Sequence, residues 1–155
     1  MSNVKIIDGD ICNATEKYII HQCNCTSRGA RGVAQAIFER FPYSNVYKQR
    51  NGKRDKPGTI KVCGNGSSER YVIALFGQYG WGKPDKKDDS PEKRLQFFKS
   101  GLAKIGEIKN LESVAFPYLV GCGSAGGKWE DYLKEIEMFA DIFQVPVTLY
   151  KLTLK

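Results

Sequence analysis

Two glycine-rich polar loops carry the residues of this 155-residue chain that could do chemistry. The first loop, residues 24–32, follows an apolar, β-branched segment, and the second, residues 121–127, follows a shorter one. A strand that passes through such a loop into a helix directs unpaired backbone N–H groups and the positive end of the helix dipole at one point. Such a point suits a phosphate, and two such loops on adjacent strands would suit a pyrophosphate.

Asn24 and the only histidine of the chain, His21, stand near the carboxyl end of the first apolar segment. Open α/β sheets bind ligands at this end of their strands. A histidine beside a phosphate can protonate the leaving oxygen or stabilise the phosphoryl charge, whereas a lone buried histidine is often structural. For Asn24 the alternative is a turn residue. Strand alternation places His21 and Cys23 on one face and Asn24 on the other, so the chain must bend to bring His21 and Asn24 together.

The second loop matches the pattern G-x-G-x-x-G, with an acidic residue downstream, at Gly121, Gly123, Gly126 and Asp141. That dinucleotide-binding fingerprint opens a βαβ unit early in a larger sheet, whereas only one helix and one strand remain here, so we reject it. A P-loop is also rejected, because Lys128 is followed by Trp129 rather than by Ser or Thr. Glycines that serve only tight turns remain the alternative for each loop.

Apolar periodicity and turn residues predict the elements around these loops. Helices are predicted at 33–41, from Pro91 with Ser90 as the N-cap, and at 129–143. Strands are predicted at 4–7, 18–23, 59–63, 70–76, 113–117 and 147–152, with a hairpin joining the third and fourth. Residues 43–56 and 77–89 are predicted as polar loops. Because strands and helices interleave, we expect one α/β domain over residues 1–155.

The composition limits the partners. The chain is 41% hydrophobic, which is enough for a core, and its formal net charge is +7. No apolar run approaches the roughly 20 residues that cross a bilayer, and the N-terminus lacks the apolar core of a signal peptide, so we expect no membrane partner. The charge favours an anionic partner. The basic runs 48–54 and 83–87 are either solvated loops or a surface that steers a polyphosphate or a nucleic acid.

Five cysteines, an odd number, lie mostly in apolar segments. Free thiols in a reducing cytoplasm explain them better than a disulfide framework, so a cytoplasmic location is expected, with the nucleus left open. Cys23, Cys25, Cys122 and His21 have the ligand chemistry of a zinc site, but a single C-x-C pair is poor spacing for a metal. We therefore expect no metal and interpret the cysteines as small apolar core residues.

In their order along the chain, these segments resemble the macrodomain pattern. The matching segments are Gly9-Asp10-Ile11, His21-Gln22-Cys23-Asn24, residues 32–37, Pro117 and residues 121–127, and the resemblance extends to the closing strand. Within that family the chain is most similar to the small stand-alone proteins of the yeast ADP-ribose-1''-phosphate phosphatase type and to their phage and bacterial relatives. The His-x-Cys-Asn-Cys run and residues 76–80 carry this closer similarity.

The resemblance implies a three-layer α/β/α fold with a central mixed sheet, an ADP-ribose cleft above the strand ends, and no cofactor. It implies that Asp10 and Ile11 bind the adenine, whereas the residues alone favour Asp10 as a turn residue after Gly9. One phosphate would contact the backbone of Arg31, Gly32 and Val33. The other phosphate and the distal ribose would contact the second loop, at Gly121, Cys122, Gly123, Ser124, Ala125 and Gly126.

The same resemblance implies that Asn24 holds the distal ribose and that His21 and Asn24 are the catalytic pair. Ala125 departs from the pattern, because relatives that hydrolyse ADP-ribosyl esters carry an aspartate there and many binders carry an aromatic residue that stacks on the distal ribose. Tyr79 or Trp81 from the 77–89 loop is our candidate substitute for that aromatic ring. Three aspartates of the same loop could bring a carboxylate to the site, although solvating the loop is their simpler role: Asp85, Asp88 and Asp89.

These considerations rank the functions. The first is a metal-independent enzyme that hydrolyses ADP-ribose 1''-phosphate to ADP-ribose and phosphate. The second is a reader that binds free or macromolecule-linked ADP-ribose without turnover. The third, mono-ADP-ribosyl hydrolysis, is disfavoured by Ala125. A nucleic-acid binder driven by charge is the least favoured, and a steep salt dependence of binding would distinguish it.

Overall fold

The computed structural model describes residues 3–84 and 87–153, with a six-stranded mixed sheet at the centre. The strands are Val4–Asp8 (β1), Tyr18–Asn24 (β2), Ile60–Cys63 (β3), Tyr71–Gln78 (β4), Val114–Pro117 (β5) and Val147–Lys151 (β6). Their order across the sheet is β1-β6-β5-β2-β4-β3. Neighbouring strands run parallel except for β3, which is antiparallel to β4 as a hairpin requires.

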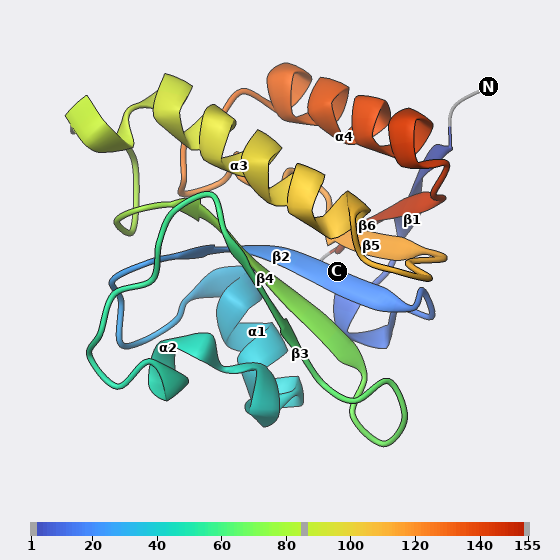
Figure 1. Cartoon of the computed structure of the whole chain (residues 1–155), viewed down its shortest axis with the longest axis horizontal. Coiled ribbons are helices and arrows are strands. Elements are labelled where there is room, and N and C mark those ends of the chain that lie inside the picture. The colour runs from blue at the N-terminus through green and yellow to red at the C-terminus, as the bar shows by residue number, and fades with distance from the viewer. Residues whose placement is uncertain (1–2, 85–86, 154–155) are drawn as a thin grey trace.

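Helices cover both faces of the sheet (Figure 1). The first face carries α1 (Gly32–Arg40) and α2 (Val46–Gln49), and the other carries α3 (Pro91–Gly106) and α4 (Trp129–Phe143). Short 3₁₀ turns lie at Ile11–Asn13 (η1), Pro42–Ser44 (η2) and Lys87–Asp89 (η3). The expected three-layer α/β/α arrangement around a mixed sheet is thus confirmed. None of the helices in the described residues has the length and apolar character to span a bilayer.

The start of α3 follows from its local sequence. The Ser90 side chain accepts a hydrogen bond from the backbone N–H of Lys93 at 3.2 Å, and Pro91 is the first helical residue, as predicted. The segment 43–56 differs from the prediction, because it contains α2. Asn45 caps this helix, and the first two residues of the helix, Val46 and Tyr47, are buried. A stretch that is polar on average therefore contributes two residues to the core.

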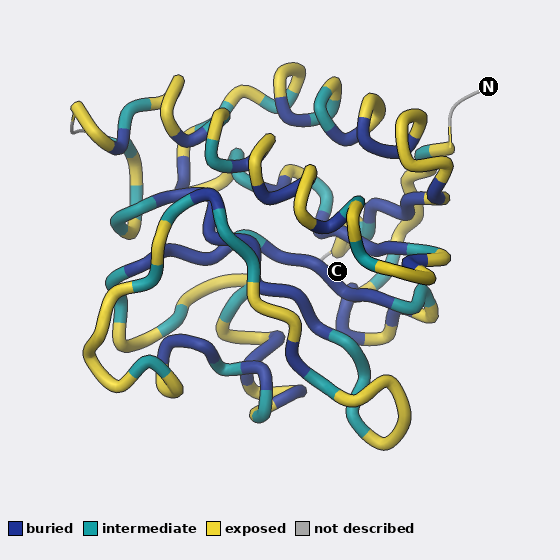
Figure 2. Tube along the Cα trace, in the orientation of Figure 1, coloured by how far each residue is buried: buried dark blue, intermediate teal, exposed yellow. Residues whose placement is uncertain are grey.

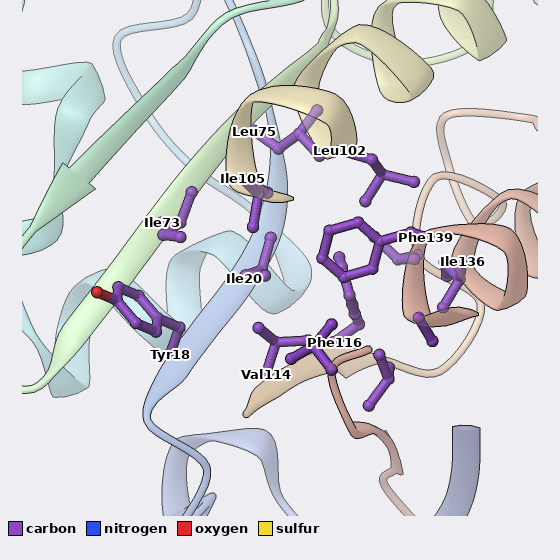
Figure 3. Packing of buried hydrophobic residues seen from close by; sticks show 14 of the residues in the cluster. Tyr18, Ile20, Ile73, Leu75, Leu102, Ile105, Val114, Phe116, Ile136 and Phe139 are labelled. Carbon is purple, nitrogen blue, oxygen red and sulfur yellow. The ribbon is translucent and has the colours of Figure 1, made fainter. Parts of the chain in front are cut away.

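Alternating side chains of the sheet build a hydrophobic core on each face. Along the trace in Figure 2, β2 and β4 are mostly buried, whereas the helices alternate between buried and exposed residues. In β2, Tyr18 and Ile20 belong to the core beneath α3 and α4, whereas Ile19 belongs to the core beneath α1 and α2. Figure 3 shows the first of these cores, where side chains of β2, β4 and β5 meet those of α3 and α4. Gly101 lets α3 approach β4 closely, since a Cβ at that residue would lie 2.5 Å from Leu75 Cγ.

Phe116 tests the contribution of this core. Its side chain is fully buried, and its ring centroid lies 6.4 Å from the centroids of both Phe98 and Phe139. We expect Phe116→Ala to lower the free energy of unfolding in urea by about 3–5 kcal/mol, because it leaves a cavity. Ile142→Ala on the exposed side of α4, where Ile142 is 67% exposed, should change it by less than about 0.5 kcal/mol. Equal losses in the two variants would contradict this description of the core.

Candidate functional site

A cleft of about 1000 Å³ opens where β5, β2 and β4 end. These strands are parallel neighbours, so their carboxyl ends meet at one edge of the sheet, and both glycine loops line the cleft there. The lining residues are His21, Gln22, Asn24, 26–34, Tyr47, Gln78, Trp81, Gly82, 117–121 and 123–125. The exposed Arg28 and Arg31 are among them, and none of the lining residues within the described ranges is a carboxylate.

The side chain of Asn24 is held in one orientation. Its Oδ1 accepts hydrogen bonds from the backbone N–H groups of Thr26 (3.1 Å) and Ser27 (2.8 Å) and from Arg50 Nη2 (3.3 Å). These donors distinguish the oxygen from the nitrogen, and Nδ2 has no hydrogen-bond partner in the part of the chain that the structure describes. Because Asn24 lines the cleft, Nδ2 is the donor that it can offer to a ligand.

A bulge brings His21 and Asn24 to the same cleft. The register of β2 against β4 shifts between Cys23 and Asn24 and leaves Gly77 unpaired. A Cβ at residue 77 would lie 2.3 Å from Gln22 Oε1, so the glycine lets the Gln22 side chain pack against the bulge. Bulges re-aim side chains at strand ends, and His21 and Asn24 both line the cleft. The bend that the sequence required is therefore present.

His21 is buried and uncharged. It is 1% exposed, its ring lies edge-on to Phe38 with the centroids 5.4 Å apart, and its Nε2 lies 3.6 Å from Cys23 Sγ. Burial lowers the pKa of His21 to about 4. At neutral pH the ring can stabilise a phosphoryl oxygen through one N–H group. It is not the imidazolium that protonation of a leaving oxygen would require.

Each glycine loop presents a run of backbone N–H groups that have no acceptor in the described ranges. In the first loop, α1 begins at Gly32 without a side-chain cap, and the N–H groups of residues 32–34 are unpaired. In the second loop the N–H groups of residues 123–125 are unpaired, while those of Gly126 and Gly127 bond back within the loop. Both runs line the cleft, which is the arrangement that two neighbouring phosphates require.

The loop after β4 contributes one aromatic ring to the cleft. Trp81 lines the cleft and is 74% exposed. Tyr79 does not line it, and its hydroxyl accepts a hydrogen bond from Arg54 Nη1 at 2.6 Å. Tyr79 and Trp81 were the candidates to supply the aromatic ring that Ala125 lacks. Of these two residues, only Trp81 lines the cleft.

Asp88 and Asp89 of this loop do not line the cleft. Asp89 is 4% exposed and forms an ion pair with Arg94 at 2.7 Å, so the expectation that it solvates the loop is wrong. Burial alone would raise the pKa of Asp89, but hydrogen bonds from Arg94 and from two backbone N–H groups hold it below its usual value. Asp88 is exposed, and Asp85 lies outside the described residues.

The predicted site residues divide into two groups. Those that line the cleft are His21, Asn24, Arg31, Gly32, Val33, Gly121, Gly123, Ser124 and Ala125. Those outside its lining are Asp10, Ile11, Tyr79, Cys122 and Gly126. Asp10 is exposed, and its Oδ1 accepts a hydrogen bond from the backbone N–H of Cys12 at 2.9 Å, while Ile11 is buried in the core beneath α1.

Among the site residues that sequence reasoning missed, three have identifiable roles or positions. Tyr47 and Gln78 line the cleft, and Arg50 holds its first loop. Tyr47 and Arg50 lie in the stretch predicted as a polar loop, where no sequence signal distinguishes them. Tyr47 Oη accepts a hydrogen bond from the backbone N–H of Asn24 at 2.9 Å, and the Arg50 guanidinium lies 4.5 Å from the Tyr47 ring centroid. Gln78 ends the strand beside β2, a position that the strand-end rule could have identified.

The sulfur atoms near the cleft do not form a metal centre. Cys12, Cys23, Cys25 and Cys63 are buried free thiols, and Cys122 is a half-buried one. Burial raises the pKa of the Cys122 thiol to about 11, so it stays protonated at neutral pH. Within residues 3–84 and 87–153, no group of three or more His, Cys, Asp or Glu side chains could hold a metal ion.

Comparisons with known proteins agree with this geometry. The family model described as Macro domain matches residues 5–136. A protein of unknown function from Bacteroides thetaiotaomicron is similar over 96% of this chain and 98% of its own, at 26% identity and a TM-score of 0.74. The macrodomain of Mycobacterium tuberculosis DarG is similar over 97% and 98%, at 20% identity and a TM-score of 0.75. A Trypanosoma brucei macrodomain in complex with ADP-ribose is similar over 97% and 63%, at 16% identity and a TM-score of 0.69. A sequence comparison with curated proteins finds no match.

The buried neutral His21 should make stability depend on pH. The unfolded chain, with a histidine pKa of 6.5, binds a proton before the folded chain, with a pKa of about 4, so the unfolding free energy falls as pH falls through this window. Between pH 7 and pH 5 the loss should be about 2 kcal/mol. Because His21 is the only histidine, urea unfolding of His21→Gln should lack this component. Identical pH profiles of the two proteins would contradict the burial of a neutral ring.

Proposed function

The chain belongs to the macrodomain family, and on that basis we propose that its cleft binds ADP-ribose. The observation that carries the proposal is the pair of unpaired N–H runs, at residues 32–34 and 123–125, on the wall of one cleft. Arg28 and Arg31 add positive charge to that wall, and its described lining has no carboxylate to repel an anion. A ligand with two adjacent phosphates satisfies both runs at once.

The rest of the ligand follows from the two phosphate positions. Asn24 Nδ2 donates to a hydroxyl of the distal ribose, next to the anomeric carbon. Three apolar side chains line the cleft although they are exposed, and they offer surfaces to the sugar and base: Val33, Trp81 and Leu119. Asp10 and Ile11 lie outside the cleft lining, so the adenine must extend beyond that lining to reach them. There Asp10 accepts from the adenine amine through Oδ2, the carboxylate oxygen that does not cap η1, and the Ile11 N–H donates to the ring.

The activity that we propose is hydrolysis of ADP-ribose 1''-phosphate. The oxygen of a water molecule forms a bond to phosphorus as the bond between phosphorus and the 1''-oxygen breaks. The 1''-oxygen takes a proton from this water, and the products are ADP-ribose and inorganic phosphate. Asn24 fixes the ribose, and the N–H groups of residues 123–125 stabilise charge on the phosphoryl oxygens. His21 acts as a neutral hydrogen-bonding group, since its pKa of about 4 keeps it unprotonated.

A reader that binds ADP-ribose without turnover is the second candidate. Two observations favour it. No carboxylate stands among the described residues that line the cleft, and His21 is neutral. The described lining therefore offers no carboxylate base and no imidazolium acid for catalysis. Ala125 lines the cleft at the position where an aspartate would serve ester hydrolysis, so the hydrolase of ADP-ribosyl esters is not favoured.

Phosphorus NMR of ADP-ribose 1''-phosphate with the protein distinguishes these functions. We expect an inorganic phosphate signal to grow, and Asn24→Asp to abolish it. This change keeps the oxygen that accepts from the first loop but removes the Nδ2 donor and adds a negative charge. Asn65→Asp is the matched control, because Asn65 Oδ1 also accepts from two backbone N–H groups but lies outside the cleft. It should remain active.

Other outcomes of this measurement are equally definite. Broadened pyrophosphate signals without hydrolysis would make the protein a reader. Unchanged signals would refute ADP-ribose binding in the cleft. Binding to a polynucleotide that collapses with added salt would identify the charge-driven alternative.

Asp10 tests the adenine end. Asp10→Ala should weaken ADP-ribose binding by about 1–3 kcal/mol in calorimetry, because it leaves the adenine amine unpaired. It should also lower stability by about 1 kcal/mol, because the cap of η1 is lost. Asp10→Asn retains an oxygen for the cap but presents a donor to the amine, so it should keep the stability and lose the affinity. An unchanged dissociation constant in both variants would remove Asp10 from the site.

A further inference from the structure

We propose that Arg94 is a positioning residue that locks the Trp81 segment, residues 79–82, to the second glycine loop. It lies in the first turn of α3 and does not line the cleft. Nothing in the sequence motif marks it, because a basic residue in a helix is usually solvated. Here Arg94 is instead among the largest side chains that are fully buried.

All five N–H donors of the Arg94 guanidinium are used. Nε and Nη2 donate to the two carboxylate oxygens of Asp89, at 3.1 and 2.7 Å. The second N–H of Nη2 donates to the carbonyl oxygen of Gly80 at 3.2 Å. Nη1 donates to the carbonyl oxygens of Gly82 and of Ala125, the latter at 3.0 Å. One nitrogen atom therefore joins two loops that are more than forty residues apart in the sequence.

Asp89 completes the same unit from the other side. Its Oδ1 accepts from the backbone N–H of Tyr79 at 2.8 Å, and its Oδ2 accepts from that of Gly80 at 2.9 Å. Since Arg94 donates one further bond to each oxygen, each carboxylate oxygen accepts two hydrogen bonds. The ion pair therefore leaves no donor or acceptor unsatisfied, which a buried charged pair requires.

This unit fixes the place of Trp81. The residues on both sides of Trp81 are anchored, since the carbonyl oxygens of Gly80 and Gly82 both accept from Arg94. The indole itself is largely exposed, so its position on the cleft wall is set by these anchored neighbours in the chain. The second loop also lies close to the residues that follow this segment, because a Cβ at Gly126 would lie 3.1 Å from Pro84 Cδ.

Stability alone does not explain such a pair. Replacing a buried ion pair with apolar residues of similar volume is often neutral or stabilising. Apolar residues could not bind three carbonyl oxygens from two loops, however, and a lysine offers three donors without the planar fork. What Arg94 supplies is a fixed distance between Trp81 and the N–H donors of residues 123–125. Under the proposed function, these groups face the distal half of ADP-ribose.

Amide hydrogen exchange of the ligand-free protein tests the lock independently of any ligand. In Arg94→Lys, exchange should accelerate by roughly tenfold or more at the hydrogen-bonded amides of both segments, 79–82 and 121–127, with α1 and β2 unchanged. These amides are Tyr79 and Gly80 in the first segment and Cys122, Gly126 and Gly127 in the second. Arg40→Lys, the same change at an exposed arginine on α1, should leave both segments as in the wild type. Unchanged exchange in the two segments, or a uniform increase throughout the chain, would overturn the proposal. Asp89→Asn serves if Arg94→Lys does not fold, and it should affect the same two segments.

Ligand binding tests what the lock is for, and this part rests on the proposed function. Arg94→Lys should weaken the binding of ADP-ribose by roughly tenfold but leave the affinity for AMP unchanged, because AMP lacks the distal phosphate and ribose. Trp81→Ala should also weaken ADP-ribose, and the double variant should lose less than the product of the two single losses. Equal losses for AMP and ADP-ribose would overturn the positioning role. If the wild type binds neither ligand, the proposed function fails, while hydrogen exchange still decides whether Arg94 locks the two loops.

Discussion

Each glycine loop of the cleft is held by a buried arginine that has its own carboxylate partner. Arg50 pairs with Asp55 at 2.9 Å and binds the carbonyl oxygen and side chain of Asn24 in the first loop. Arg94 pairs with Asp89 and binds the second loop. Loops rich in glycine and polar residues have little apolar surface to bury, so directional, charge-assisted hydrogen bonds fix them instead. The unpaired N–H groups can serve a ligand because they are held in place before it arrives.

The arginines depend in turn on the packed layers of the fold. Arg94 is in the first turn of α3, and the Ser90 cap fixes where that helix begins. The helix is seated on β4 at Gly101, where its backbone approaches the Leu75 side chain. Arg50 lies directly after α2 and stacks on Tyr47, which belongs to the core beneath α1 and α2. The hydrophobic cores therefore place the arginines, and the arginines place the loops.

The charges are distributed so that the cleft favours an anion. Unpaired N–H groups, the start of α1 and two exposed arginines all contribute positive potential to its wall. Asp55 and Asp89, the carboxylates that pair with the arginines of the two loops, are each neutralised by that arginine. His21 adds no charge, since burial keeps its imidazole neutral. The cleft is therefore polar and cationic, with no charge of the opposite sign among its described lining residues.

The layers, the two glycine loops and nine of the residues that line the cleft could be predicted from the sequence. These features depend on neighbours close in the chain, such as the Ser90–Pro91 helix start and the alternation in β2. Which side chains converge depends on contacts between distant segments. The bulge at Gly77 brings Asn24 to the cleft beside His21, and it exists in the pairing of two strands rather than in either one. Likewise, Arg94 and Ala125 meet across thirty-one positions, so no local pattern could have revealed that Arg94 binds the second loop, or that Trp81 rather than Tyr79 lines the cleft.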